Sequence, residues 1–214
     1  MPRPALMRLN ASVLVAAAAV GVALVYIIFV GSARGRSLDQ SLLVHASMGR
    51  RESVADVLVE ALNLVTSPLA AIVIVLTALR VRGPAAALAT VVLIGGTALT
   101  AEGLKALLGT LDPFNGESKR ELGPHFYPSG HAALTMSLCL AAILAAPSSW
   151  RRVVTVGAAV AAAILGGAIF ISGSHYPSDV LGGFLVALGW AAACWRLSAP
   201  SWGSRREFVQ EESA

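Results

Sequence analysis

Six long apolar runs, separated by short polar segments, dominate the chain. The first run, residues 11–30, carries no charge, and at about 1.5 Å rise per residue it matches a hydrocarbon core of roughly 30 Å. The other runs are rich in Ala, Val, Leu, Ile and Gly and cover residues 62–79, 84–104, 132–146, 153–171 and 180–195. Small residues let membrane helices approach closely. The pattern predicts an all-α, polytopic membrane protein with six transmembrane helices.

The first run has an alternative interpretation as a cleaved signal peptide. Arg3 and Arg8 precede it, and small residues at 31–33 resemble a cleavage site. The run is longer than the apolar region of most signal peptides, which favours a membrane span.

Between the first two runs, apolar residues recur at helical spacing, at Val54, Val57, Leu58, Ala61, Leu62 and Val65. Charged residues fill other positions of the same segment. The pattern predicts an amphipathic helix at the outer membrane interface that leads into the second span. A solvated connector with no catalytic role is the simpler interpretation.

The composition agrees with a membrane protein. Hydrophobic residues make up 56% of the 214 residues, charged residues 13%, and the mean hydropathy is +0.73. These values exclude an ordinary soluble domain and a disordered chain. Cys139 and Cys194 both lie in apolar runs, which excludes a disulfide scaffold. We find no internal repeat, so we expect a single membrane domain over residues 1–214.

Basic residues flank the apolar runs and indicate how the chain is oriented. The net charge is +4, but no Lys/Arg cluster is interleaved with aromatic residues, so we expect no nucleic-acid partner. Six spans place both termini on one side. If that side is the cytoplasm, the basic residues inside are Arg3, Arg8, Arg80, Arg82, Arg151, Arg152, Arg196, Arg205 and Arg206. We therefore predict an integral protein of the cell membrane with both termini cytoplasmic.

With this topology, polar residues from three separate segments meet at the outer face. Lys105 follows the third run, His131 precedes the fourth, and His175 and Asp179 lie between the fifth and sixth. An active site at the boundary between lipid and water requires this kind of convergence.

The segment Pro128-Ser129-Gly130-His131 is suited to binding an anion. Ser129 can cap the helix that follows, and the free N–H groups of its first turn then point at a ligand. Gly130 permits close backbone approach, and His131 can donate a proton. An ordinary helix cap with an interfacial histidine is the alternative.

His175 and Asp179 are four residues apart around Pro177. A carboxylate at this spacing can hold one imidazole nitrogen protonated and leave the other free to attack phosphorus or carbonyl carbon, or to bind a metal. Beside a second histidine and an anion-binding helix start, the pair favours catalysis.

Residues 102–190 resemble the type 2 phosphatidic-acid phosphatase (PAP2) superfamily of membrane enzymes. The family pattern is Lys-x6-Arg-Pro, Pro-Ser-Gly-His, and Ser-Arg-x5-His-x3-Asp. Here Lys105 opens the first block, residues 128–131 match the second, and His175 with Asp179 closes the third.

The resemblance implies the role of each residue. His175 would be the nucleophile that forms a phosphohistidine, Asp179 its orienting carboxylate, and His131 the acid for the leaving oxygen. Lys105, Ser129 and Gly130 would bind the phosphoryl group, with no metal or other cofactor. The substrate would be a lipid-linked phosphate or pyrophosphate whose tail stays among the membrane lipids.

The chain departs from the family at both arginines, which are replaced by Asp112 and Ile169; Ala168 replaces the serine. An arginine binds phosphoryl oxygens through a bidentate fork that neither replacement can imitate. We expect the loop before Pro128 to supply the missing cations, with Lys119 and Arg120 as substrate-binding residues and His125 nearby.

Two other functions stay open. A pseudoenzyme would keep the fold and bind a lipid headgroup without turnover. A metal site could use His131, His175, Asp179 and His125, although their spacing matches no standard ligand motif.

The topology is testable by labelling. In a background without Cys139 and Cys194, the variants Lys119→Cys and Ser204→Cys should react with an impermeant thiol reagent from opposite sides of sealed vesicles, because an odd number of spans separates them. Labelling of both from the same side would contradict the orientation.

Overall fold

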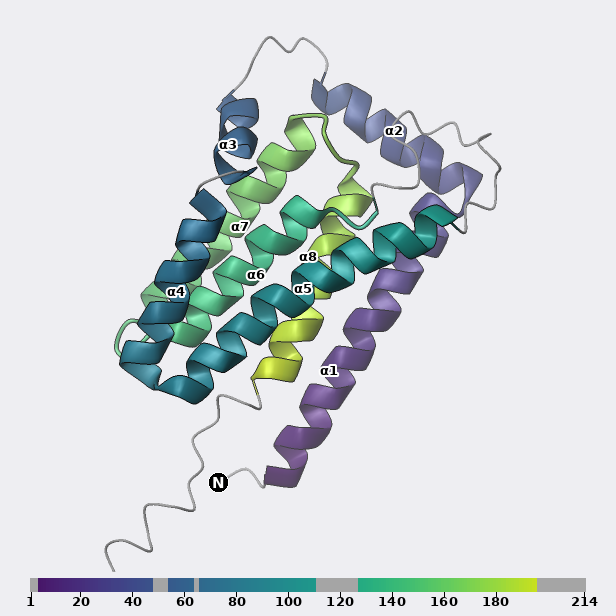
Figure 1. The fold of residues 1–214 in the computed structure, drawn as a ribbon. Coiled ribbons are helices and arrows are strands. Elements are labelled where there is room, and N and C mark those ends of the chain that lie inside the picture. The colour runs from purple at the N-terminus through teal and green to yellow at the C-terminus, as the bar shows by residue number, and fades with distance from the viewer. Residues whose placement is uncertain (1–3, 48–53, 64–65, 111–126, 196–214) are drawn as a thin grey trace, which may run out of the picture.

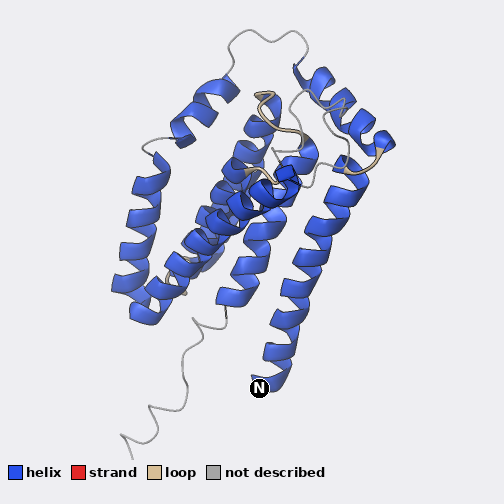
Figure 2. Cartoon of the chain, turned by 45° about the vertical axis from the view of Figure 1, so that its right-hand side comes forward, coloured by secondary structure: helices blue, strands red, loops and turns tan. Residues whose placement is uncertain are grey.

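The computed structural model describes residues 4–47, 54–63, 66–110 and 127–195. All regular secondary structure in these ranges is helical, as Figure 2 shows. The elements in chain order are α1 (Pro4–Val25), the π-helical turn η1 (Tyr26–Val30), α2 (Ala33–Ser47), α3 (Val54–Asn63), α4 (Thr66–Arg82), α5 (Pro84–Thr110), α6 (Gly130–Ala145), α7 (Arg151–Ile171) and α8 (Pro177–Cys194). The all-α prediction is confirmed.

Helices α6 and α8 form the centre of the bundle. Helix α6 contacts α4, α5, α7 and α8, while α8 also contacts α1 and α5 (Figure 1). Helices α2 and α3 lie at the end of the bundle where α7 ends and α8 begins. The starts of the two central helices, α6 and α8, therefore lie at this same end.

Four of the described helices are long and apolar enough to cross a membrane: Ala11–Val30, Pro84–Leu108, Arg151–Ile171 and Pro177–Cys194. Helix α6 is a shorter apolar helix, and α4 has 17 residues. The chain is thus an integral membrane protein, and its apolar runs coincide with helices. The count of six spans and their orientation stay predictions.

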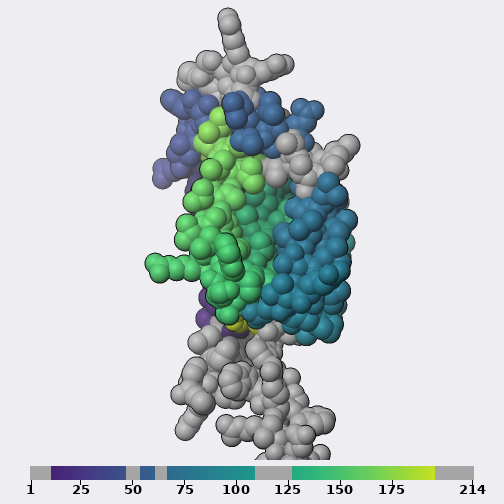
Figure 3. All heavy atoms as spheres, turned by 90° about the vertical axis from the view of Figure 1, so that its left-hand side faces the viewer, coloured from purple at the N-terminus to yellow at the C-terminus, as the bar shows by residue number. Residues whose placement is uncertain are grey.

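The outward side chains of the bundle are apolar. Helices α4 and α7 form one side of the molecule (Figure 3), and large hydrophobic residues are exposed along both, including Ile72, Val73, Val156 and Val160. Exposed apolar side chains at this density are costly in water and favourable in lipid.

Helix α2 is an element that the apolar pattern did not predict. Its sequence mixes charged, polar and apolar residues and has no long hydrophobic run, and it follows η1 after only two residues. The Nη1 atom of Arg36 donates to the carbonyl of Val30 at 3.0 Å and fixes α2 against the end of α1 and η1.

Helix α3 lies in the segment where the pattern predicts a helix, and its apolar residues differ in their exposure. Ala55 and Val59 are buried in a cluster with Ile169 of α7, and Leu58 packs against that cluster. Val54 and Val57 instead point away from the protein, with 77% and 66% of their surface exposed. Helix α3 therefore packs on α7 through Ala55 and Val59. The position of α3 at the membrane interface stays a prediction.

Backbone contact between α6 and α8 leads to a stability prediction at Gly183. A Cβ atom there would lie 2.5 Å from the carbonyl oxygen of Ser129 and 2.8 Å from the amide nitrogen of Ala133. The variant Gly183→Ala must push the helices apart, so we expect it to lose about 1–3 kcal/mol of stability.

Gly167→Ala on α7 is the matched control, because a Cβ atom there meets nothing within 4 Å. Thermal unfolding in detergent should show a lower transition temperature for Gly183→Ala alone. Equal stability of both variants would contradict the close packing of α6 on α8.

Candidate active site

Helix α6 begins with the serine N-cap that the sequence predicts. Ser129 has extended backbone angles, φ −65° and ψ 118°, and its Oγ accepts a hydrogen bond from the Ala132 amide at 3.2 Å. The N-cap role of Ser129 is confirmed. Its side chain is fully buried, so the cap is sheltered from water. The first turn of α6 then presents its remaining N–H groups toward the end of the bundle.

One backbone hydrogen bond joins the start of α6 to the start of α8. The amide of Ser129 donates to the carbonyl oxygen of Asp179 at 2.9 Å. The two segments are 50 residues apart in the sequence by their numbering, yet this bond holds them in register. The Pro-Ser-Gly-His segment and the His-Tyr-Pro-Ser-Asp segment therefore form one structure.

The carboxylate of Asp179 lies at the start of α8 and is fully buried. Its Oδ2 accepts a hydrogen bond from the Tyr176 amide at 3.1 Å and lies 3.9 Å from Nδ1 of His175. The second distance is longer than that of a hydrogen bond. The carboxylate thus caps α8 and faces the Nδ1 side of the imidazole.

The two histidines lie side by side. Their ring centroids are 5.7 Å apart with 58° between the ring planes. His175 is buried, with 6% of its surface exposed, and His131 is half-buried. Two imidazoles at this separation can contact opposite sides of one small group placed between them and the start of α6.

Lys105 reaches the site from α5 and is held there by Glu102. The Nζ atom of Lys105 lies 2.6 Å from Oε1 of Glu102, one turn earlier on the same helix. A Cβ atom on Gly130 would lie 2.9 Å from both Nζ and Oε1. The ammonium group therefore lies directly over the start of α6, where its charge adds to the positive end of the helix dipole.

The described candidates thus meet at one place: Lys105, Ser129, Gly130, His131, His175 and Asp179. Lys119 and Arg120, together with Asp112 and His125, lie outside the described residues. Among the residues that the structure does describe, no group of three or more His, Cys, Asp or Glu side chains is arranged to hold a metal ion.

The position of the second family arginine lies in an apolar environment. Ile169 has no exposed surface and packs in one cluster with Ala55, Val59, Ala132 and Ala168. This cluster adjoins the first turn of α6 through Ala132. An arginine at this position would place its charge among the apolar side chains of this cluster.

Tyr127 and Glu102 are site neighbours that the sequence interpretation missed. Tyr127 is fully buried, donates from its hydroxyl to the carbonyl of Val22 at 2.6 Å, and lies 5.6 Å from the Tyr26 ring. It ties the segment before Ser129 to α1. The i, i+3 spacing of Glu102 and Lys105 could have indicated their contact. No pattern in the sequence near Tyr127 indicates its contact with α1, because Val22 is 105 residues away.

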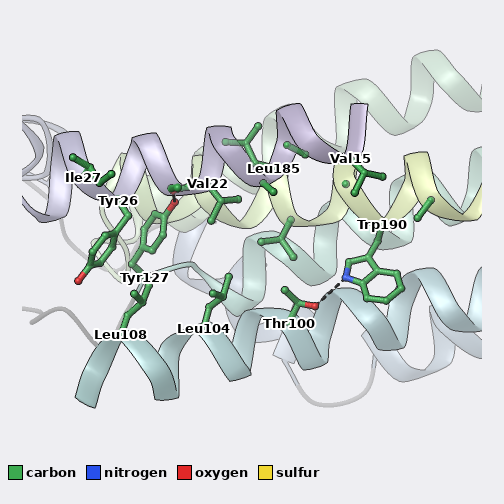
Figure 4. Close-up of a pocket in the computed structure, with 16 residues that line it drawn as sticks. Val15, Val22, Tyr26, Ile27, Thr100, Leu104, Leu108, Tyr127, Leu185 and Trp190 are labelled. Carbon is green, nitrogen blue, oxygen red and sulfur yellow. Dashed lines mark hydrogen bonds between the residues drawn. The ribbon is translucent and has the colours of Figure 1, made fainter. Parts of the chain in front are cut away.

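An apolar groove runs beside the site between α1, α5 and α8. Its volume is about 600 Å³, and Tyr26, Leu108 and Tyr127 lie at one end, as Figure 4 shows. At the other end, Trp190 donates from Nε1 to Oγ1 of Thr100 at 2.9 Å. Because Tyr127 lines the groove and precedes Ser129 by two residues, the groove begins next to the helix start.

Comparison with known families shows to which family the chain belongs. The model of the PAP2 superfamily matches residues 84–202, more than half of the chain and all of the described candidates. The chain belongs to the PAP2 superfamily.

A solved structure has the same fold. The chain is similar to the crystal structure of the first transmembrane PAP2 type phosphatidylglycerolphosphate phosphatase from Bacillus subtilis, with a TM-score of 0.63 and 20% sequence identity. The match covers 96% of this chain and 100% of that one. Comparison with curated proteins finds no significant match.

The position of Lys105 over Gly130 leads to a prediction on anion binding. In Gly130→Ala the new methyl group must displace the ends of two flexible side chains, Lys105 and Glu102, and no backbone atom. We therefore expect a nearly unchanged unfolding temperature but clearly weaker binding of orthophosphate, measured by its protection against thermal unfolding. Unchanged phosphate protection would show that the ammonium group over Gly130 does not bind the anion.

Proposed function

We propose that the protein is a membrane phosphatase or phosphotransferase that hydrolyses a lipid-linked phosphate or pyrophosphate at the outer membrane face. One observation carries the proposal. The rings of His131 and His175 lie 5.7 Å apart beside a buried carboxylate, at a helix start that Lys105 covers. Membership of the PAP2 superfamily supports the same reaction class.

The first chemical step uses His175 as the nucleophile. Its Nδ1 faces Asp179 at 3.9 Å, so its other nitrogen, Nε2, is the one available to phosphorus. The Nε2 lone pair forms the N–P bond while the P–O bond to the lipid breaks. His131 gives its proton to the departing oxygen.

The second step releases phosphate. Water attacks the phosphorus of the phosphohistidine, His131 takes a proton from that water, and the N–P bond breaks to return His175. If an alcohol takes the place of water, the same step transfers the phosphoryl group. Throughout, Lys105 and the N–H groups of the α6 start stabilise negative charge on the phosphoryl oxygens.

The apolar groove supports a lipid as the substrate. Val22, Leu104 and Leu185 line it, and it begins at Tyr127, next to Ser129. A hydrocarbon tail in this groove would stay in an apolar environment while its phosphate lies at the α6 start.

A lipid-headgroup-binding pseudoenzyme is the second candidate, and Ile169 favours it. This residue occupies the position of a family arginine and is buried among apolar side chains. Loss of a transition-state clamp costs roughly a hundredfold or more in rate. Enzyme activity therefore requires that Lys105, or the predicted residues Lys119 and Arg120, compensate.

The histidines provide the direct test of function. His175→Ala should abolish phosphate release from a lipid phosphate in mixed micelles. His131→Ala should slow a poor alkoxide leaving group by roughly a hundredfold or more but slow nitrophenolate much less, because a low-pKa leaving oxygen needs little protonation.

His45→Ala is the matched control, because His45 is an exposed histidine of α2 whose Nδ1 contacts the Ser41 carbonyl. It should keep the rate of the native chain. Equal losses with both leaving groups would mean that His131 is not the acid. A folded native chain without turnover would support the pseudoenzyme, and turnover that a chelator removes and a divalent cation restores would support a metal site.

A further inference from the structure

Helix α2 carries a buried carboxylate that contacts the proposed catalytic segment. Asp39 lies in the middle of α2 and has no exposed surface. Its Oδ1 accepts a hydrogen bond from the Ser178 amide at 3.3 Å, and its Oδ2 accepts from the Ser178 hydroxyl. Ser178 lies directly before Asp179 and three residues after His175. This contact joins two segments 139 residues apart.

A buried carboxylate is costly unless hydrogen bonds and favourable charges compensate for its lost hydration. Asp39 has such compensation because it lies at the start of α8, where the helix dipole favours negative charge. Two carboxylates therefore share this helix start. Asp39 binds the amide of Ser178 from outside the segment, while Asp179 binds the amide of Tyr176 from within it.

Contacts with the preceding turn η1 hold helix α2 in place, and they therefore fix the position of the Asp39 backbone. A Cβ atom on Gly35 would lie 1.9 Å from the carbonyl oxygen of Ile28, which means that α2 packs backbone to backbone on η1. The bond from Arg36 to Val30 fixes the same turn. A movement of α2 would thus be transmitted to Ser178.

We propose that Asp39 is a positioning residue for catalysis. It holds Ser178 so that Asp179 faces Nδ1 of His175 and Nε2 faces the substrate. The proposal rests on the proposed function, because His175 must be the nucleophile for its orientation to set the rate. In this role Asp39 acts through Ser178 and does not itself take part in the chemistry.

The test compares Asp39→Asn, Ser178→Ala and the double variant. Asp39→Asn keeps the size of the side chain but replaces one acceptor oxygen with an amide donor. A displacement of the nucleophile by about 1 Å costs roughly a hundredfold in rate, so we expect kcat to fall tenfold or more while KM stays unchanged. Ser41→Ala is the control, because the exposed Ser41 hydroxyl donates to Leu38 of its own helix.

If Asp39 acts through Ser178, the double variant should be no slower than the slower single variant. Multiplied losses in the double variant would overturn the proposal, and so would a native kcat in Asp39→Asn. If Asp39→Asn does not fold, Ser178→Ala decides alone. It removes the hydroxyl bond to Asp39 and keeps the amide bond, so we expect a smaller loss of kcat, and a native kcat in this variant also overturns the proposal.

A purely structural role would lower the amount of folded protein but leave kcat per folded molecule unchanged. Thermal unfolding and kcat are therefore measured on the same preparations. His175→Ala separates the two proposals: full turnover in that variant contradicts the function, whereas an inactive His175→Ala beside a fully active Asp39→Asn contradicts only the positioning role.

Discussion

The site depends on one hydrogen bond between two helix starts. The Ser129 amide donates to the Asp179 carbonyl, and Gly183 lets the helices approach closely enough for it to form. A lone helix start in a membrane protein leaves unpaired N–H groups, which are costly in an apolar environment. Here the α6 start faces the two histidines and Lys105. At the neighbouring α8 start, the amides of Tyr176 and Ser178 instead donate to carboxylates. Anion binding and catalysis can then share the same few side chains.

The surrounding elements fix this pair of helix starts from three sides. Glu102 holds Lys105 over Gly130, Tyr127 ties the segment before α6 to α1, and Asp39 contacts the start of α8. Preorganised charge of this kind is more effective than charge that must reorient during the reaction. Ile169, which the motif resemblance aligns with a family arginine, is part of an apolar cluster next to the first turn of α6.

Local patterns allowed much of this to be predicted from the sequence. The apolar runs located the helices, and Ser129 before an apolar run indicated an N-cap, because both signals lie within a few residues. Helix α2 and the Asp39–Ser178 contact could not be predicted. Helix α2 has no apolar run, and the contact joins residues 139 positions apart, which no periodicity encodes. The packing of Ala55 and Val59 against Ile169 could not be predicted either, because it joins segments that are far apart in the sequence.

The central claim is that His175 carries the phosphoryl group during turnover. The most direct test is to mix the purified protein with a lipid phosphate labelled at phosphorus, stop the reaction within the first turnover, and map the label by peptide analysis. We predict an acid-labile, alkali-stable phosphate on the peptide that contains His175, and none in the folded His175→Ala variant. Turnover without any trapped label, or label that persists in His175→Ala, would contradict this account.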